Sequence, residues 1–107
     1  SIQKIKTKTK SVVRLTKEHY FDIFNKTLTC KDQFLRLTSK ELDFLLLLVR
    51  HKNRVISYQE IENSVYVGDY MSEDSLKGLV KNLRKKISKE FIENHSKLGY
   101  RISLYHG

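Results

Sequence analysis

The chain has 107 residues, enough for one hydrophobic core but not for two, so we expect a single domain. Lysine and arginine number 21 against 12 acidic residues, and the resulting formal charge of +9 favours a polyanionic partner: DNA, RNA or an anionic membrane surface. No signal peptide or membrane-spanning apolar run is visible, and the single cysteine, Cys30, excludes an internal disulfide, so we expect a cytoplasmic protein.

The first part of the chain divides into an arm and a small sheet. Residues 1–10 hold four lysines and little to bury, which predicts a linker or flexible arm before a folded domain at 11–107. Four short β-rich pieces follow, separated by polar pairs that suit tight turns, and they predict an antiparallel meander. These pieces are Val12–Thr16, His19–Phe24, Lys26–Lys31 and Gln33–Leu37.

At Thr38 the hydrophobic period becomes helical. Thr38 and Glu41 form a capping box, an apolar stripe continues to His51, and Asn53 could supply a left-handed stop. A second capping box, Ser57 to Glu60, predicts a helix of about two turns. The stretch from Tyr66 to Met71 is expected to be a loop with Gly68-Asp69 as its turn.

The third expected helix begins at Ser72 and contains the basic stretch Leu76–Lys89. One side of this stretch is an apolar stripe that requires a core. The rest is cationic, without any acid between Leu76 and Lys89, and could meet a nucleic-acid groove; the alternative is a merely solvated basic face. Gly78 costs about 1 kcal/mol relative to alanine inside a helix, and either allows close backbone approach to DNA or has no role.

A β-hairpin is expected after the basic helix. Phe91–Asn94 and Gly99–Leu104 are strand-like runs on either side of His95-Ser96-Lys97. Two helices joined by a loop, the second one basic and followed by a hairpin, indicate a winged helix.

At this point the sequence resembles the effector domain of the OmpR/PhoB class of bacterial response regulators. Five groups of residues, in this order and at this spacing, carry the resemblance. They are Leu37-Thr38 with Glu41 and Leu45-Leu46; Asn53 to Ser57; Val65-Tyr66; Leu83 to Ile87; and Gly99 to Ile102.

The resemblance implies an α+β fold: a winged helix-turn-helix with an N-terminal four-stranded antiparallel sheet, three helices and a C-terminal β-hairpin wing. It also implies a receiver domain upstream, dimerisation on DNA under the control of phosphorylation, and contact of the 66–71 loop with RNA polymerase. The third helix would enter the major groove of double-stranded DNA, and the wing would touch the minor groove beside it.

Eight residues are the candidate DNA contacts. Lys81 and Lys85 are placed to meet base edges and Asn82 to pair with adenine, whereas Lys77 and Arg84 suit phosphates better. Resemblance supports Lys81, Asn82 and Arg84, and adds Tyr100 in the wing and Tyr66 near a phosphate. The wing tip lacks the family's arginine, which leaves Lys97 as its best contact. The candidates are Tyr66, Lys77, Lys81, Asn82, Arg84, Lys85, Lys97 and Tyr100.

The sequence shows little sign of a metal site or of a catalytic site. The four histidines and Cys30 show no metal-ligand spacing, and no phosphate loop or nucleophile motif is present, so we expect no cofactor and no enzyme. The alternative function is a protein-interaction module of the same fold that recruits a partner through the 66–71 loop and the N-terminal sheet.

Overall fold

The structure, a computed structural model, describes residues 11–105. It begins with a four-stranded antiparallel sheet in the order β1-β2-β3-β4, which confirms the expected meander. Each strand is two residues shorter than the pattern suggested. The strands are β1 (Val12–Arg14), β2 (His19–Asp22), β3 (Thr27–Cys30) and β4 (Gln33–Leu35).

Polar pairs close the turns of this sheet, as predicted. Lys31 and Asp32 both have positive φ, 52° and 67°, which suits the right-handed twist of the two strands that they join. Phe21 and Leu28 face each other across β2 and β3 and are fully buried. The inner face of the sheet therefore belongs to the core.

Three helices follow, and each begins at a capping box. They are α2 (Ser39–Arg50), α3 (Tyr58–Val65) and α4 (Glu73–Lys86), capped by Thr38, Ser57 and Ser72. The expected stop at Asn53 is wrong: α2 ends at Arg50 with His51 as its C-cap, and Asn53 is not among the residues with positive φ. Arg54 instead closes a turn by donating its backbone N–H to the His51 carbonyl.

The chain ends in a wing that has one strand more than expected. β6 (Ile92–His95) and β7 (Gly99–Ile102) form the predicted hairpin, and β5 (Ile56–Ser57) pairs with the outer side of β7. Gly99 permits this pairing, because a Cβ at that position would lie 1.8 Å from the Ile56 carbonyl oxygen. The wing is thereby attached to the start of α3.

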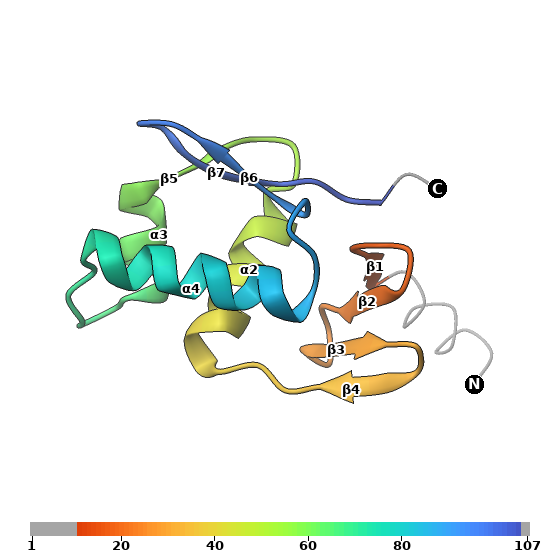
Figure 1. Cartoon of the computed structure of the whole chain (residues 1–107). Coiled ribbons are helices and arrows are strands. Elements are labelled where there is room, and N and C mark those ends of the chain that lie inside the picture. Colours follow the sequence, from red (N-terminus) through yellow and green to blue (C-terminus); the bar gives the residue numbers. More distant parts are fainter. Residues whose placement is uncertain (1–10, 106–107) are drawn as a thin grey trace.

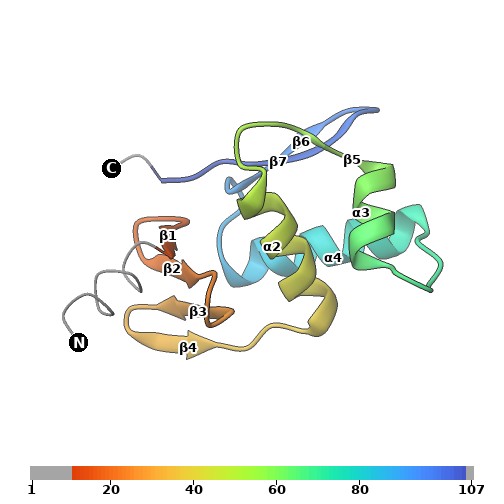
Figure 2. The ribbon, with the colours of Figure 1, turned by 180° about the vertical axis from the view of Figure 1, so that it is seen from behind.

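α4 runs along the molecule beneath the wing, from α3 at one end to the N-terminal sheet at the other (Figure 1). Seen from behind, α2 lies across α4 (Figure 2). The core between them contains Phe44, Leu45 and Leu48 of α2 and Leu76, Val80 and Leu83 of α4. One side of α4 is therefore held by the whole domain, and the other side remains exposed.

Candidate nucleic-acid interface

The two sides of α4 differ sharply in chemistry. Its inward side buries Leu76, Leu79, Val80 and Leu83, so Leu79 is a core residue. Its outward side exposes Lys77, Lys81, Asn82 and Lys85, while the exposed acids Glu73 and Asp74 lie in the first turn, where the helix dipole favours negative charge. Positive charge is thus concentrated in the middle and the C-terminal half of the helix.

A groove of about 760 Å³ separates α4 from the wing, and basic side chains dominate its lining. Five of the predicted contacts line it: Lys77, Lys81, Arg84 and Lys85 from α4 and Tyr100 from the wing. Lys89 lies beyond the end of the helix and adds a fifth cationic group. Asn94 and Tyr100 contribute the opposite wall from the wing. An anionic chain lying in this groove would meet cations along one whole side.

Arg84 and Tyr100 form the inner part of the groove rather than its rim. Arg84 is half-buried and donates from Nη2 to the Ile92 carbonyl oxygen at 2.7 Å, which ties the helix to the wing. Tyr100 is buried, with its ring edge-on to Phe44 and Tyr58, and burial raises the pKa of its hydroxyl. Both residues therefore have a structural role inside the domain, and their DNA contacts stay predictions.

The wing tip is close enough to α4 to extend the groove. A second hollow lies between the N-terminal half of α4 and the wing, and its charged lining residues are Glu73 and Lys77 of α4 and Lys97 of the wing tip. Lys97 is exposed and has φ of 66°, so the turn presents it outward. Ser88, Lys89 and Asn94 are polar residues of the groove lining that are not among the eight candidates. Lys89 belongs to the basic stretch Leu76–Lys89, whereas nothing in the local pattern of Asn94 sets it apart, because only the fold brings it to α4.

Lys86, which belongs to the basic stretch Leu76–Lys89, is half-buried on the flank of α4 and does not line the groove. Its Nζ pairs with Oε1 of Glu41, a carboxylate whose side chain is only 3% exposed, and also donates to the Arg36 carbonyl. His19 of β2 places its Nε2 3.1 Å from the Lys86 carbonyl oxygen. The C-terminal end of α4 is therefore held by α2 and by the N-terminal sheet.

Two predicted contacts lie outside the groove. Asn82 is exposed on the outward side of α4 but is not among the lining residues, so it faces away from the wing. Tyr66, the C-cap of α3, is 4% exposed, and Lys40 Nζ lies 5.2 Å from its ring centre. The position of Tyr66 in the core argues against the predicted phosphate contact.

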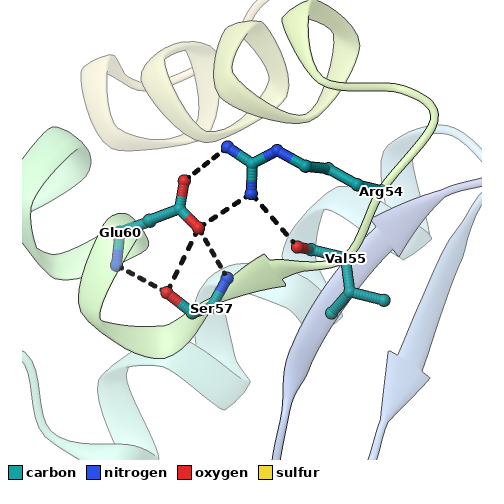
Figure 3. A network of polar contacts seen from close by, with 4 residues as sticks. All are labelled: Arg54, Val55, Ser57 and Glu60. Atoms are coloured by element: carbon teal, nitrogen blue, oxygen red, sulfur yellow. Dashed lines mark hydrogen bonds and ion pairs between the residues drawn. The ribbon is translucent and has the colours of Figure 1, made fainter.

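The start of α3 is fixed by a polar network, drawn in Figure 3. Arg54 donates two hydrogen bonds to the carboxylate of Glu60, at 2.9 and 2.7 Å, while Glu60 completes the capping box with Ser57. The bond from Arg54 lowers the pKa of Glu60 from 4.5 to about 2. Because Ser57 also belongs to β5, the network sets where α3 leaves the wing sheet.

The remainder of the described chain offers few other sites. Residues 11–105 contain no group of three or more histidine, cysteine or acidic side chains placed to hold a metal ion. Within the same residues, no helix combines the length and apolarity needed to cross a membrane. Cys30 is a free thiol, half-buried on β3.

Comparison with known proteins gives a consistent family. Residues 32–102 match the family model described as "Transcriptional regulatory protein, C terminal". Over 69 residues the chain is 38% identical to the transcriptional regulatory protein CssR of Bacillus subtilis, covering 64% of this chain and 31% of CssR. It is 34% identical over 74 residues to the regulatory protein VanRB of Enterococcus faecalis, covering 68% of this chain and 34% of VanRB. The chain therefore spans about a third of the length of these relatives.

Comparison with solved structures is consistent with this family. The DNA-binding domain of B. subtilis CssR is 31% identical, with a TM-score of 0.60 over 79% of this chain and 90% of that one. The DNA-binding domain of Escherichia coli CadC has the same fold at 20% identity, with a TM-score of 0.73 over 88% of this chain and 92% of that one. The chain thus belongs to the family of C-terminal DNA-binding domains of OmpR/PhoB-type transcriptional regulators, the output domains of two-component response regulators.

Proposed function

We propose that this domain binds double-stranded DNA sequence-specifically, with α4 in the major groove and the wing beside the adjacent phosphate backbone. The observation that carries the proposal is the basic groove between α4 and the wing, with Lys77, Lys81 and Lys85 exposed on one wall. Two solved domains of this fold, those of AdeR and of RstA from Klebsiella pneumoniae, are complexes with an intercistronic region and with the RstA box.

Within this proposal the cationic side chains divide by position. Lys77 and Lys89 lie beside the wing and Lys97 lies at its tip, and all three suit the phosphates that border the groove. Lys81, Asn82 and Lys85 project from the outward face and suit base edges, where lysine donates to guanine and asparagine pairs with adenine. Arg84 contributes mainly by holding the wing, since its guanidinium already bonds to Ile92.

Salt dependence of duplex binding tests the proposal. Each phosphate neutralised by a lysine adds roughly −0.9 to the slope of log K against log salt, so three to five such contacts give a slope of about −3 to −5. Lys77→Ala should make the slope shallower by about 1, whereas Lys52→Ala, an exposed lysine near the end of α2, should leave it unchanged. A slope near zero for the parental domain would refute DNA binding.

The complete regulator extends the proposal beyond this chain. We infer an upstream receiver domain whose phosphorylation promotes dimerisation on DNA, a cytoplasmic location and no catalytic activity of the output domain. The length of the relatives supports an additional domain, because CssR and VanRB are about three times as long as the segment that aligns. Gel filtration of the full-length regulator with and without a phosphoryl donor would test the dimerisation.

A second function, recruitment of RNA polymerase, is favoured by the loop between α3 and α4. Tyr70 and Val67 are 83% and 75% exposed there, while the Lys40–Asp69 ion pair at 2.9 Å and the turn at Gly68 hold the loop in shape. Exposed apolar side chains on an anchored loop suit a protein partner. Tyr70→Ala should reduce transcription in a purified system without changing DNA affinity; a parallel loss of DNA affinity would contradict a separate role.

A further inference from the structure

Gly78 lies at the centre of the outward face of α4. At 100° per residue it points opposite to the buried Leu76 and Leu83, and its neighbours one turn away are Asp74, Lys81 and Asn82. All three neighbours are exposed. The outward side of the helix, which carries the proposed DNA contacts, therefore has no side chain at its middle.

Nothing within residues 11–105 accounts for a glycine at this position. A Cβ placed on Gly78 would meet no atom within 4 Å, and its φ is not positive, so neither close packing nor backbone conformation calls for it. Gly99 differs from Gly78 in this respect, because a Cβ at Gly99 would collide with the backbone of Ile56. Gly78 thus lowers helix stability for no benefit to the folded domain alone.

We propose that Gly78 is a positioning residue for DNA: it allows the backbone of α4 to lie against the base edges and so sets how deeply the helix enters the major groove. That depth decides whether the shorter side chain of Asn82 reaches a base, because lysine can compensate for an extra ångström and asparagine cannot. The inference rests on the proposed DNA binding and adds a residue that makes no contact through a side chain.

The proposal is tested by measuring the thermal stability and the DNA affinity of the Gly78→Ala variant. The duplex probe is selected from a random-sequence pool with the parental domain, and a scrambled duplex of equal length and composition measures non-specific binding. The midpoint of thermal unfolding should rise by about 4–8 °C, since alanine is the better helix former and has room. Affinity for the selected duplex should fall at least tenfold, while affinity for the scrambled duplex stays within twofold.

Ser64→Ala is the matched control, because Ser64 is exposed on α3 and the change also raises helix propensity. It should leave both affinities unchanged. If Gly78→Ala binds the selected duplex as tightly as the parental domain does, or loses both affinities equally, the positioning role is wrong. Failure of the parental domain to enrich any duplex, or salt-independent binding, would instead refute the proposed function itself.

Discussion

At the scale of single residues, the glycines show how one residue type serves different needs. Gly99 lies against Ile56, so a side chain there would separate β5 from β7. Gly68 turns the loop before α4 with φ of 73° and has open space around it. Gly78 has neither constraint. The cost of replacing each glycine by alanine should therefore differ in size and even in sign.

We expect Gly99→Ala to destabilise the domain by at least about 3 kcal/mol, because the backbone of β5 must move to remove the collision. Gly68→Ala, the control, should cost only about 1 to 2 kcal/mol for its left-handed backbone. Urea unfolding followed by circular dichroism measures both. Equal losses for the two variants would contradict the close pairing of β5 and β7.

At the scale of elements, α3 is a helix of only eight residues whose start is fixed by charge. An isolated helix of that length is unstable in water, so its position depends on tertiary contacts and on the network around Glu60. The partner of Glu60, Arg54, precedes β5, and their bond therefore joins the helix to the approach of the wing strand. Weakening it should loosen α3 before it affects α2.

The lowered pKa of Glu60 gives this network a dependence on pH. Because the carboxylate is bound more tightly to its partners when ionised, its contribution to stability is complete above pH 4.5 and is lost as the pH falls toward about 2. Glu60→Gln should lower the unfolding midpoint by roughly 2–4 °C at pH 7, and the difference should shrink below pH 4.5. Glu62→Gln, on the same helix but outside the network, is the control; a pH-independent difference for Glu60→Gln would refute the interpretation.

At the scale of the whole molecule, contacts distant in sequence join the three parts of the domain to α4. The wing is held by Arg84, the N-terminal sheet by His19, and α2 by the pair of Lys86 with Glu41. Each of these contacts is made on the buried side of α4 or at its C-terminal end. The helix backbone that carries the outward lysines is consequently held in place by contacts on its other side.

Lys86 and Lys85 should therefore behave oppositely although they are adjacent. Lys86→Met leaves the buried carboxylate of Glu41 without its cation and should destabilise the domain by about 2 kcal/mol, less than for a fully buried pair because Lys86 is 35% exposed. Lys85→Met should change stability by less than about 0.5 kcal/mol but weaken DNA binding.

A double-mutant cycle with Glu41→Gln isolates the pair, since glutamine keeps the capping geometry of α2. Chemical denaturation of the four proteins should give a coupling of about 1 to 3 kcal/mol. Additive losses in the cycle would show that Lys86 and Glu41 do not stabilise the fold as a pair.

Features that depend on neighbouring residues could be predicted from the sequence, whereas contacts between distant residues could not. Capping boxes at Thr38 and Ser57 are local patterns, and they located α2 and α3 correctly. The pairing of Lys86 with Glu41 joins residues 45 positions apart, so a helical projection, which places Lys86 on the flank of the helix, could not show its partner in α2. β5 has only two residues and no period of its own; its partner β7 lies more than 40 residues later.

The end of the basic helix was misjudged for a related reason. The pattern of charges continues to Lys89, but α4 stops at Lys86 and Ile87 is its C-cap. Ile87 and Phe91 both enter the core, and the chain must leave the helix to bring Phe91 there before β6 begins. For the site, Lys77, Lys81 and Lys85 of the groove were selected from the sequence but Asn94 was not, because its proximity to α4 depends on the fold of the wing.

The division of α4 into a held side and an exposed side has a practical consequence for redesign. Operator preference should be transferable between relatives by exchanging only positions 74, 78, 81, 82 and 85, all of which lie on the outward side. A graft of the whole helix would also replace Arg84 and Lys86, and with them the attachments to the wing and to α2. If the proposed DNA binding holds, we expect re-targeting to require changes at only these five positions on an otherwise unchanged scaffold.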